Sequence, residues 1–170
     1  MLSPVQISKR LQKAAGFLEL EMPAEALDTL APIEIDGLRP LTYLRATALN
    51  NLHRYDEAWS LYARMLDEKP GDVAAAVGKA WCEKRLGRLD DAIATLEESA
   101  RRNPREAILQ YNLACYHALR TEKSRCLTRL GVAIRLDRGY ADLIGKEADF
   151  DSLRDDADFA SLIAMASGDR

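Results

Sequence analysis

The side chains that could perform acid–base or nucleophilic chemistry are few and lie far apart along the chain. The sequence holds two histidines, His53 and His117, and three cysteines. Cys115 and His117 are close enough in sequence to suggest a thiolate–imidazole pair. They fall within one expected helix, however, and residues two apart on a helix point in different directions, so the two side chains cannot meet. Nucleophilic catalysis therefore has no candidate pair.

The remaining polar residues are better explained by helix structure than by catalysis. Asp90-Asp91 and Asp155-Asp156 are paired acids, and the helix dipole favours carboxylates at helix N-termini. Cys82, Cys115 and Cys126 fit the interior as small apolar residues. No zinc-protease spacing, CxxC pair or glycine-rich phosphate loop occurs. The sequence predicts a protein that is not an enzyme and that uses no cofactor or metal.

The composition is that of a globular domain with a sizeable core. The chain has 170 residues, of which 48% are hydrophobic and 30% charged. A net charge of −3 and a pI near 5.5 argue against a nucleic-acid partner, because such binders usually carry a basic surface. Three cysteines without motif spacing fit a reducing compartment. We find no signal-peptide pattern and no stretch of ~18 apolar residues, so we expect a cytoplasmic protein without a membrane partner.

Small residues recur at a fixed period and indicate which elements must position any binding residues. Two columns step by 32, 34 and 34 residues, and large apolar residues follow the second column at i+1 and i+4. Small residues let two helices approach closely where they cross, and the large residues fill the space around the crossing. The columns are Ala14, Ala46, Ala80 and Ala114, and then Ala26, Ala58, Ala92 and Cys126.

Turn and stop signals divide each repeat into two antiparallel helices. Gly87 can adopt the left-handed conformation that ends a helix. Pro70 and Pro104 stop the second helix of their repeats, since proline cannot continue the hydrogen-bond ladder. One such hairpin cannot bury its apolar face alone, so at least three stacked copies are expected. The sequence therefore predicts an all-α protein built from helical hairpins.

These repeats resemble the tetratricopeptide repeat, a helical hairpin with a 34-residue period. The resemblance is carried by LNNLHRYDEAWSLYARMLDEKP from Leu49, CEKRLGRLDDAIATLEESARRNP from Cys82 and YNLACYHALRTEKSRCLTRLGVAIRLD from Tyr111, with a weaker copy in LELEMPAEALDTLAPI. It implies an α–α superhelix, a solenoid of about four hairpins over residues 1–138, at about 5–38, 39–72, 73–106 and 107–138. Residues 139–170 are expected to form C-terminal capping helices of the same domain.

Several residues depart from the pattern of the family. His53 and Thr121 stand where a turn glycine is usual, and Arg138 replaces the closing proline of the fourth repeat. Lys79 and Glu83 occupy positions that are often apolar in the family. The last two departures indicate either a rotated first helix in the third repeat or an alignment shifted by one residue.

The segment after Asp137 is acidic but keeps an apolar stripe at helical spacing, which includes Phe159 and Leu162. A solenoid needs a terminal cap with a polar outer face, and DFDSLRDDADF resembles the segment that closes many bacterial tetratricopeptide-repeat proteins. Asp155, Asp156 or Asp158 could cap the last helix. We therefore interpret the segment as a cap, with an acidic docking tail as the alternative.

The resemblance also implies where a ligand would bind, because the first helix of each pair lines the concave face of the superhelix. Trp81 is the most informative candidate, since a tryptophan partly exposed in a concavity is a typical binding anchor, although packing between neighbouring repeats is the alternative. Lys84 and Arg85 could pair with an acidic ligand or form a solvated helix face. The expected groove residues are Tyr43, Thr47, Asn50, Val77, Trp81, Lys84, Arg85, Tyr111, Asn112 and Cys115.

Four functions can be compared with these observations. The first is an interaction module that binds a peptide or protein segment in its groove. The second is self-assembly, or membership of a larger complex, through the terminal faces of the solenoid. The third is RNA binding, which would need a basic channel and polar readout residues in every repeat, and the fourth is an enzyme. The residues favour a non-catalytic scaffold with a protein partner, and self-assembly as the alternative.

Overall fold

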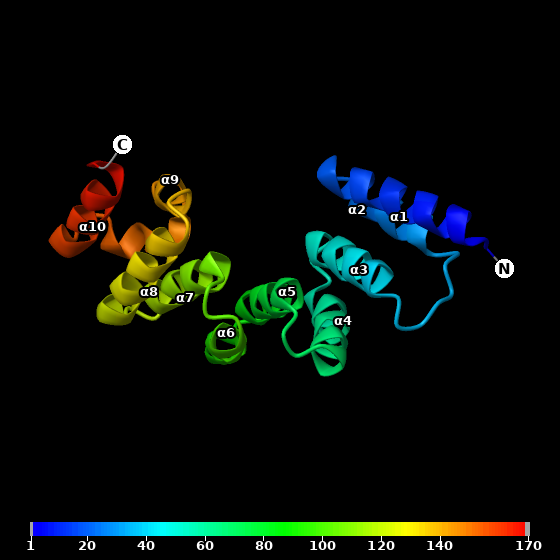
Figure 1. Ribbon diagram of the computed structural model, residues 1–170, viewed down its shortest axis with the longest axis horizontal. Coiled ribbons are helices and arrows are strands. Elements are labelled where there is room, and N and C mark those ends of the chain that lie inside the picture. Colours follow the sequence, from blue (N-terminus) through cyan, green and yellow to red (C-terminus); the bar gives the residue numbers. More distant parts are fainter. Residues whose placement is uncertain (1, 169–170) are drawn as a thin grey trace. The chain divides into compact units, whose positions relative to one another are not determined.

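The computed structural model describes residues 2–168, and every regular element in that range is a helix (Figure 1). The chain forms two compact units, Met1–Arg88 and Leu89–Arg170, which we call unit 1 and unit 2. Residues 169–170, at the end of the predicted capping segment, lie outside the described range. The all-α class predicted from the repeats is confirmed.

In the described part of unit 1, five helices pack in sequence order. Each helix contacts the next one along the chain, and both α1 and α5 also contact α3. The odd-numbered helices are therefore neighbours, as expected for the first helices of successive hairpins. The helices are α1 (Pro4–Glu19), α2 (Pro23–Leu30), α3 (Arg39–Asn51), α4 (Tyr55–Glu68) and α5 (Val73–Arg85).

In unit 2, the other elements pack around α7 and α8. α7 packs against α6, α8 and the short 3₁₀ helix η1, while α8 also contacts α9 and α10, and α10 contacts α9. The elements are α6 (Leu89–Arg102), α7 (Ala107–Leu119), α8 (Lys123–Leu136), α9 (Tyr140–Ile144), η1 (Ala148–Leu153) and α10 (Ala157–Gly168). The predicted third hairpin, residues 73–106, spans the boundary between the units, so the division into four hairpins stays a prediction.

The small residues of both predicted columns lie in the core. All eight have 0% exposed surface, from Ala14 in α1 to Cys126 in α8. In unit 1, Ala46 of α3 and Ala58 of α4 share a core cluster with Tyr62. A side chain larger than alanine at these positions would push the paired helices apart, because protein interiors are close-packed. The columns identified in the sequence are therefore confirmed as core positions.

Four helix ends share one turn geometry, with a left-handed residue at its centre. At Gly87 the backbone N–H donates to the Lys84 carbonyl at 3.1 Å, and the next N–H donates to the Glu83 carbonyl at 2.8 Å. This pair of hydrogen bonds is the Schellman motif, which places its central residue at positive φ. The same two bonds recur in all four turns, and the central residues are Glu21, His53, Gly87 and Thr121, with φ of 56°, 60°, 75° and 60°.

Thr121 is the most strained of these residues, because a β-branched side chain is disfavoured at positive φ. We expect Thr121→Gly to raise the free energy of unfolding by about 0.5–1 kcal/mol. Glycine removes the penalty of roughly 1–2 kcal/mol for a left-handed backbone. Part of this gain is lost, because glycine has more conformational freedom in the unfolded chain. Urea denaturation followed by circular dichroism measures the change.

The matched control for this substitution is Thr128→Gly, which makes the same chemical change inside α8. There the φ is helical, and we expect glycine to destabilise the protein by about 0.3 kcal/mol. A destabilised Thr121→Gly variant, or an equal change at both positions, would contradict the strain at Thr121.

The predicted proline stops lie two residues beyond the ends of the helices. α4 ends at Glu68 before Pro70, and α6 ends at Arg102 before Pro104. Three further prolines lie in the first turns of α1, α2 and α3, where a missing backbone N–H leaves no intrahelical bond unmade. Prolines therefore mark both the starts and the stops of the helices.

The segment after α8 folds onto α7 and α8 as a cap. Phe150 and Phe159 are buried and form one aromatic cluster with Tyr111 and Tyr140, in which neighbouring ring centroids lie 4.8–5.9 Å apart. Asp156 caps α10, because its Oδ1 accepts hydrogen bonds from two backbone N–H groups at 3.0 and 3.1 Å. The capping segment predicted from the sequence is present.

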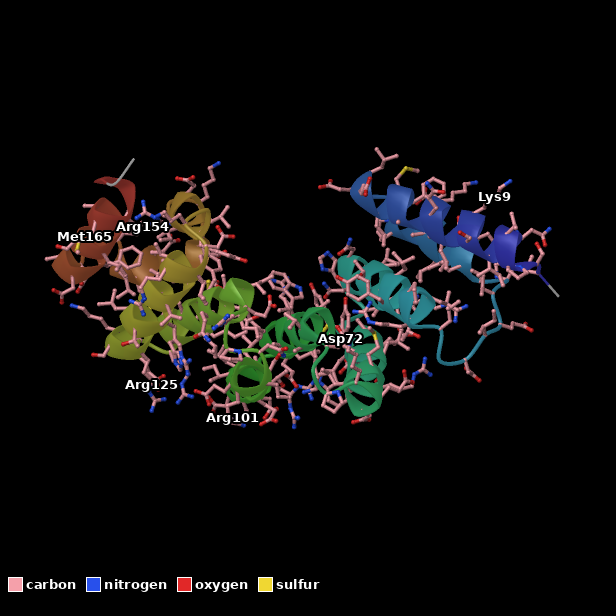
Figure 2. The ribbon with its side chains drawn as sticks, viewed as in Figure 1. Lys9, Asp72, Arg101, Arg125, Arg154 and Met165 are labelled. Atoms are coloured by element: carbon pink, nitrogen blue, oxygen red, sulfur yellow. The ribbon has the colours of Figure 1, made fainter. Side chains whose placement is uncertain are left out.

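Many exposed basic residues of unit 2 are paired with acids. Arg101 and Arg102 both contact Glu98, and the Arg125 side chain lies 3.6 Å from Glu122. Figure 2 shows Arg101 and Arg125 projecting from their helices into solvent. The pairing lowers the local positive charge, and the absence of a nucleic-acid partner stays a prediction.

Candidate functional site

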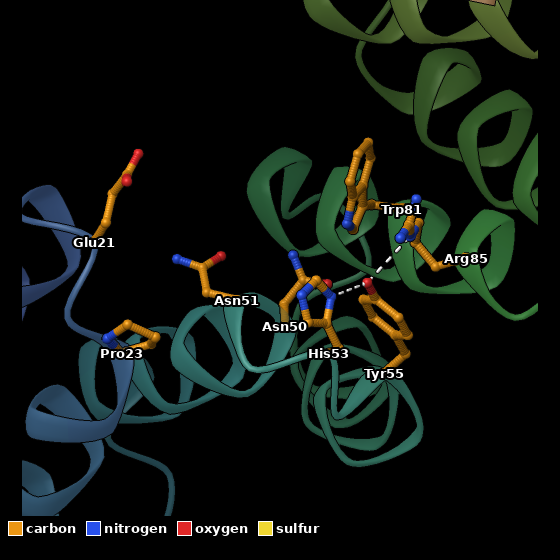
Figure 3. Close-up of a pocket in the computed structure, with 8 residues that line it drawn as sticks. All are labelled: Glu21, Pro23, Asn50, Asn51, His53, Tyr55, Trp81 and Arg85. Atoms are coloured by element: carbon orange, nitrogen blue, oxygen red, sulfur yellow. Dashed lines mark hydrogen bonds between the residues drawn. The ribbon is translucent and has the colours of Figure 1, made fainter.

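A hollow of about 550 Å³ lies in unit 1, where the turns between helices approach α5 (Figure 3). Its walls come from the α1–α2 turn, the last turn of α3, the start of α4 and one face of α5. We call it the Trp81 hollow. Its lining residues are Glu21, Pro23, Asn50, Asn51, His53, Tyr55, Trp81 and Arg85.

The Schellman turns bring two of the lining residues to the hollow. Glu21 and His53 are the left-handed residues of two successive turns, 32 positions apart. Because equivalent positions of stacked hairpins fall along one edge of a repeat array, the two side chains reach the same hollow. Tyr55 follows as the first residue of α4. The local turn geometry thus positions one side of the site.

Trp81 supplies the aromatic surface of the site. It is 39% exposed, although large aromatic side chains are usually well buried. Lys84 Nζ lies 5.3 Å and Arg85 Cζ 5.9 Å from the centroid of its ring. The spacings i+3 and i+4 on α5 place both cations beside the indole. The site therefore combines an accessible indole with two positive charges.

A chain of hydrogen bonds holds Arg85 in place. Arg85 Nε donates to Tyr55 Oη at 3.1 Å, and the guanidinium carbon lies 5.4 Å from the centroid of the Tyr55 ring. His53 Nδ1 lies 2.5 Å from the same hydroxyl, as the dashed lines of Figure 3 show. Among the residues that the structure describes, no carboxylate lies within ion-pair distance of Arg85.

Two asparagines lie between the turns and Trp81. Asn50 Oδ1 accepts a hydrogen bond from Cys82 Sγ at 3.6 Å, and Asn51 is exposed. Burial raises the pKa of the Cys82 thiol to about 11, so the thiol keeps its proton and remains a donor at neutral pH. An amide both donates and accepts hydrogen bonds, which suits it to the backbone of a bound peptide.

The structure brings together only part of the predicted groove set. Asn50, Trp81 and Arg85 line the Trp81 hollow, Lys84 flanks the indole, and Val77 is half-buried one turn earlier on α5. These residues remain the candidates for binding.

Tyr43 and Thr47 are occupied with packing inside unit 1. The Tyr43 ring meets the Tyr62 ring edge-on at 6.2 Å, and Thr47 Oγ1 lies 3.2 Å from Tyr62 Oη. Thr47 also donates to the Tyr43 carbonyl at 2.9 Å. Burial raises the pKa of Tyr62, so its hydroxyl stays neutral. These contacts give both residues a structural role between α3 and α4.

The predicted groove residues of unit 2 all lie on α7, part of which the capping segment covers. Tyr111 is 7% exposed and packs against Tyr140 and Phe150, and Cys115 is buried. The Asn112 side chain donates to a backbone carbonyl of its own helix at 2.8 Å. Because the capping segment covers Tyr111, we do not include the unit 2 residues in the site.

Sequence reasoning missed five lining residues: Glu21, Pro23, Asn51, His53 and Tyr55. They lie in turns and helix ends, whereas the prediction followed the first helices alone. The sequence nevertheless contained a signal for two of them, because Glu21 and His53 occupy the repeat position of the turn glycine, Gly87. A repeat column at a turn, and not only on a helix face, indicates residues that share one edge of the fold.

The second histidine of the chain has a structural role. His117 is buried in α7, and its Nδ1 lies 2.7 Å from an oxygen of Glu122, the residue before α8. This hydrogen bond, with Arg120 and Arg125 nearby, holds the pKa of the Glu122 carboxyl below its usual range. Within residues 2–168, no group of three His, Cys, Asp or Glu side chains could hold a metal ion. Nor is any helix there long and apolar enough to cross a membrane.

Comparisons with known proteins agree with the fold. Residues 52–114 match the family model described as the tetratricopeptide repeat. No curated protein sequence matches the chain significantly.

Several solved structures share the fold over nearly the whole chain. One is TTC0263, a thermophilic TPR protein in Thermus thermophilus, which is 19% identical with a TM-score of 0.70 over 94% of this chain and 97% of its own. A second is MamA from Desulfovibrio magneticus RS-1, 19% identical with a TM-score of 0.66 over 94% of each chain. A double mutant of MamA RS-1 is 21% identical, with a TM-score of 0.69 over 95% and 92%.

At these identities the likeness shows the fold. The family match covers two of the Schellman turns, those at His53 and Gly87. The same turn and the same buried small residues recur outside the matched range, at Glu21 and Thr121. The family match identifies tetratricopeptide repeats over residues 52–114. The repeated turns, the buried columns and the likeness to the solved structures show that the rest of the described chain has the same fold.

Proposed function

We propose that this chain is a non-catalytic interaction module that binds a segment of a partner protein at the Trp81 hollow. The observation that carries the proposal is the exposure of Trp81 beside a hollow that also contains Arg85 and two asparagines. Tryptophan and arginine are the residue types that most often dominate binding energy at interfaces. Helical repeats use such surfaces to hold extended segments of other proteins.

The non-catalytic part of the proposal rests on where the reactive groups lie. The three thiols and His117 are buried, and His53 is bonded to a tyrosine hydroxyl at a turn. The hydroxyl of the His53–Tyr55 pair at the hollow accepts a hydrogen bond from Arg85, and the thiols lie in the core and not beside the hollow, where catalysis would require a nucleophile. The cytoplasmic location predicted from the cysteines stays a prediction.

Replacing the indole tests the proposed site. We expect Trp81→Ala to weaken partner binding by about 2 kcal/mol or more, roughly thirtyfold, because a central aromatic anchor is removed. The free energy of unfolding should change by less than about 1 kcal/mol, since the side chain is partly exposed. The measurement is affinity capture from native lysate read by mass spectrometry, followed by titration of the captured partner.

The matched control is Met165→Ala, which removes an exposed apolar side chain from α10 of unit 2 (Figure 2). A partner held by wild type and by this control, but lost from Trp81→Ala, supports the proposal. Capture of the same proteins by all three chains would show that the Trp81 hollow does not bind them.

Self-assembly remains a second candidate because of an apolar hollow at the start of the chain. It has a volume of about 570 Å³, and Val5 and Ile35 are exposed nearby. A second copy could cover this surface. A constant monomer mass in light scattering over a wide concentration range would remove this candidate. The lining residues are Leu2, Pro4, Ile7, Pro32, Ile33, Glu34 and Ile35.

A further inference from the structure

Arg85 carries a charge that no acid in the described part of the chain balances. Its Nε is used by a tyrosine hydroxyl, but its two terminal amino groups make no hydrogen bond to a described residue. Two other arginines of unit 1 are paired with acids, Arg39 with Asp72 and Arg54 with Glu57. The terminal amino groups of Arg85 are therefore available to a ligand.

The guanidinium of Arg85 is also held in a defined orientation. It lies between two aromatic side chains, 5.4 Å from the Tyr55 ring centroid and 5.9 Å from that of Trp81. His53 in turn contacts the Tyr55 hydroxyl. A planar guanidinium fixed in this way can bind both oxygens of a carboxylate with little further loss of entropy.

The rest of the hollow is arranged to leave this charge open. Glu21 is the one acid among the lining residues, and Figure 3 shows it across the hollow from Arg85. No ion pair joins the two side chains. Asn50 and Asn51 lie between them and offer amide groups to the backbone of a peptide.

Resting on the proposed function, we propose that the Trp81 hollow selects an acidic segment of its partner. An Asp or Glu carboxylate of that segment pairs with Arg85, and a neighbouring aromatic or aliphatic side chain covers the Trp81 indole. A basic segment would place its cations beside Lys84 and Arg85, and like charges at such short distance repel. A neutral segment would displace water from part of the Arg85 guanidinium without replacing the hydrogen bonds that the water made.

The experiment is a selection of displayed random peptides on four forms of the full chain. These are wild type, Arg85→Glu, Trp81→Ala and the control Arg64→Glu. Arg64 is exposed on α4 and does not line the hollow, so its substitution makes the same change in net charge outside the site. Circular dichroism confirms that each variant is folded before selection.

Wild type and Arg64→Glu are expected to enrich peptides with Asp or Glu beside an aromatic or aliphatic residue. Arg85→Glu is expected to lose this acidic preference and to enrich Lys or Arg instead. The same acidic content in the pools of wild type and Arg85→Glu would overturn the proposal. A wild-type pool without acidic enrichment would overturn it as well.

The Trp81→Ala bait separates this inference from the proposed function. If wild type selects peptides without acidic enrichment and Trp81→Ala loses them, the hollow binds peptides and only the acidic preference is wrong. If Trp81→Ala retains the peptides that wild type selects, the hollow is not the binding site and both proposals are wrong.

A single selected peptide then gives the size of the effect. Its acidic residue is replaced by the isosteric amide, and both peptides are titrated by fluorescence anisotropy. We expect the amide peptide to bind wild type about tenfold more weakly, because it lacks the charge-assisted hydrogen bond to Arg85. Solvent exposure keeps the contribution of that bond modest. Both peptides should bind Arg85→Gln equally. Equal binding of the two peptides to wild type would overturn the proposal.

Discussion

Replacing Gly78 with alanine should destabilise the protein by about 2–3 kcal/mol, a large effect for one methyl group. Gly78 lies within α5, and a Cβ atom there would come within 2.7 Å of three ring carbons of Tyr62. The ring cannot move aside, because Tyr62 is buried and its hydroxyl contacts Thr47. The clash outweighs the gain of about 1 kcal/mol that alanine normally brings to a helix.

A second glycine provides the control for this prediction. Gly16 lies in α1, and a Cβ atom there would meet nothing within 4 Å. Gly16→Ala should therefore stabilise the protein by about 0.5–1 kcal/mol through helix propensity alone. Urea denaturation of both variants measures the two changes. Two stabilised variants would show that the Tyr62 ring yields and that α4 and α5 are not tightly packed there.

Removing the carboxylate of Asp72 should have the second large effect, about 2–3 kcal/mol for Asp72→Ala. Asp72 is 4% exposed and caps α5 by accepting from the Ala75 N–H at 3.2 Å. It also accepts from Arg39 Nε at 2.5 Å and from an Arg39 terminal amino group at 2.8 Å. The loss of a cap costs about 1 kcal/mol. The paired Arg39 is half exposed, so its ion pair adds less than a fully buried one would.

The pH dependence separates the charge of Asp72 from its capping role. Arg39 holds the pKa of the Asp72 carboxyl below its usual range. The hydrogen bond that the same carboxyl accepts from the Ala75 N–H also lowers this pKa. A carboxyl with a lowered folded pKa adds stability above its unfolded pKa of about 4, and this stability is lost as the pH falls through the folded value.

Asp72→Asn keeps a capping oxygen but has no charge, so the variant lacks this pH-dependent contribution to stability at every pH. The difference in unfolding free energy between wild type and Asp72→Asn should be full at pH 7 and shrink below about pH 4. Thermal denaturation from pH 7 to acid conditions measures it. A difference that stays constant into acid would assign the whole effect to hydrogen bonding or packing.

The repeat core could be predicted because it depends on local periodicity. The columns that include Ala80 and Ala92 recur at the period of the hairpin, and a helix crossing admits only small side chains there. Gly87 was predicted as the left-handed residue of its turn, and its φ of 75° confirms it. Asp156 was one of three candidates for the last N-cap, and the structure selects it.

The Trp81 hollow could be predicted only in part, because its contacts join distant positions. The bond from Arg85 to Tyr55 spans 30 residues and depends on how α4 packs against α5. Tyr111 illustrates the same limit, since the aromatic residues that cover it belong to the capping segment. A helix face read from the sequence does not show which neighbour will bury it.

The polar residues at usually apolar positions of α5 have a local explanation. Glu83 is 2% exposed and accepts from Lys79 Nζ at 2.5 Å and from Trp59 Nε1 at 3.0 Å. Lys79 and Glu83 therefore form an ion pair one helical turn apart, which provides the buried carboxylate with a hydrogen-bond donor. Ala80 lies in the core as Ala46 does in α3, so the register of α5 matches that of its neighbour without a rotation or a shift.

The buried cysteines allow the opening of the helices to be measured by thiol labelling. Cys82 lies in unit 1, and Cys115 and Cys126 lie in unit 2. Burial raises the pKa of Cys82 to about 11 and of Cys126 to about 12, so almost no reactive thiolate forms in the folded state. A thiol reagent in native buffer then labels each cysteine only when the helices around it open. The masses of partly labelled chains would reveal whether the two units open together or one at a time.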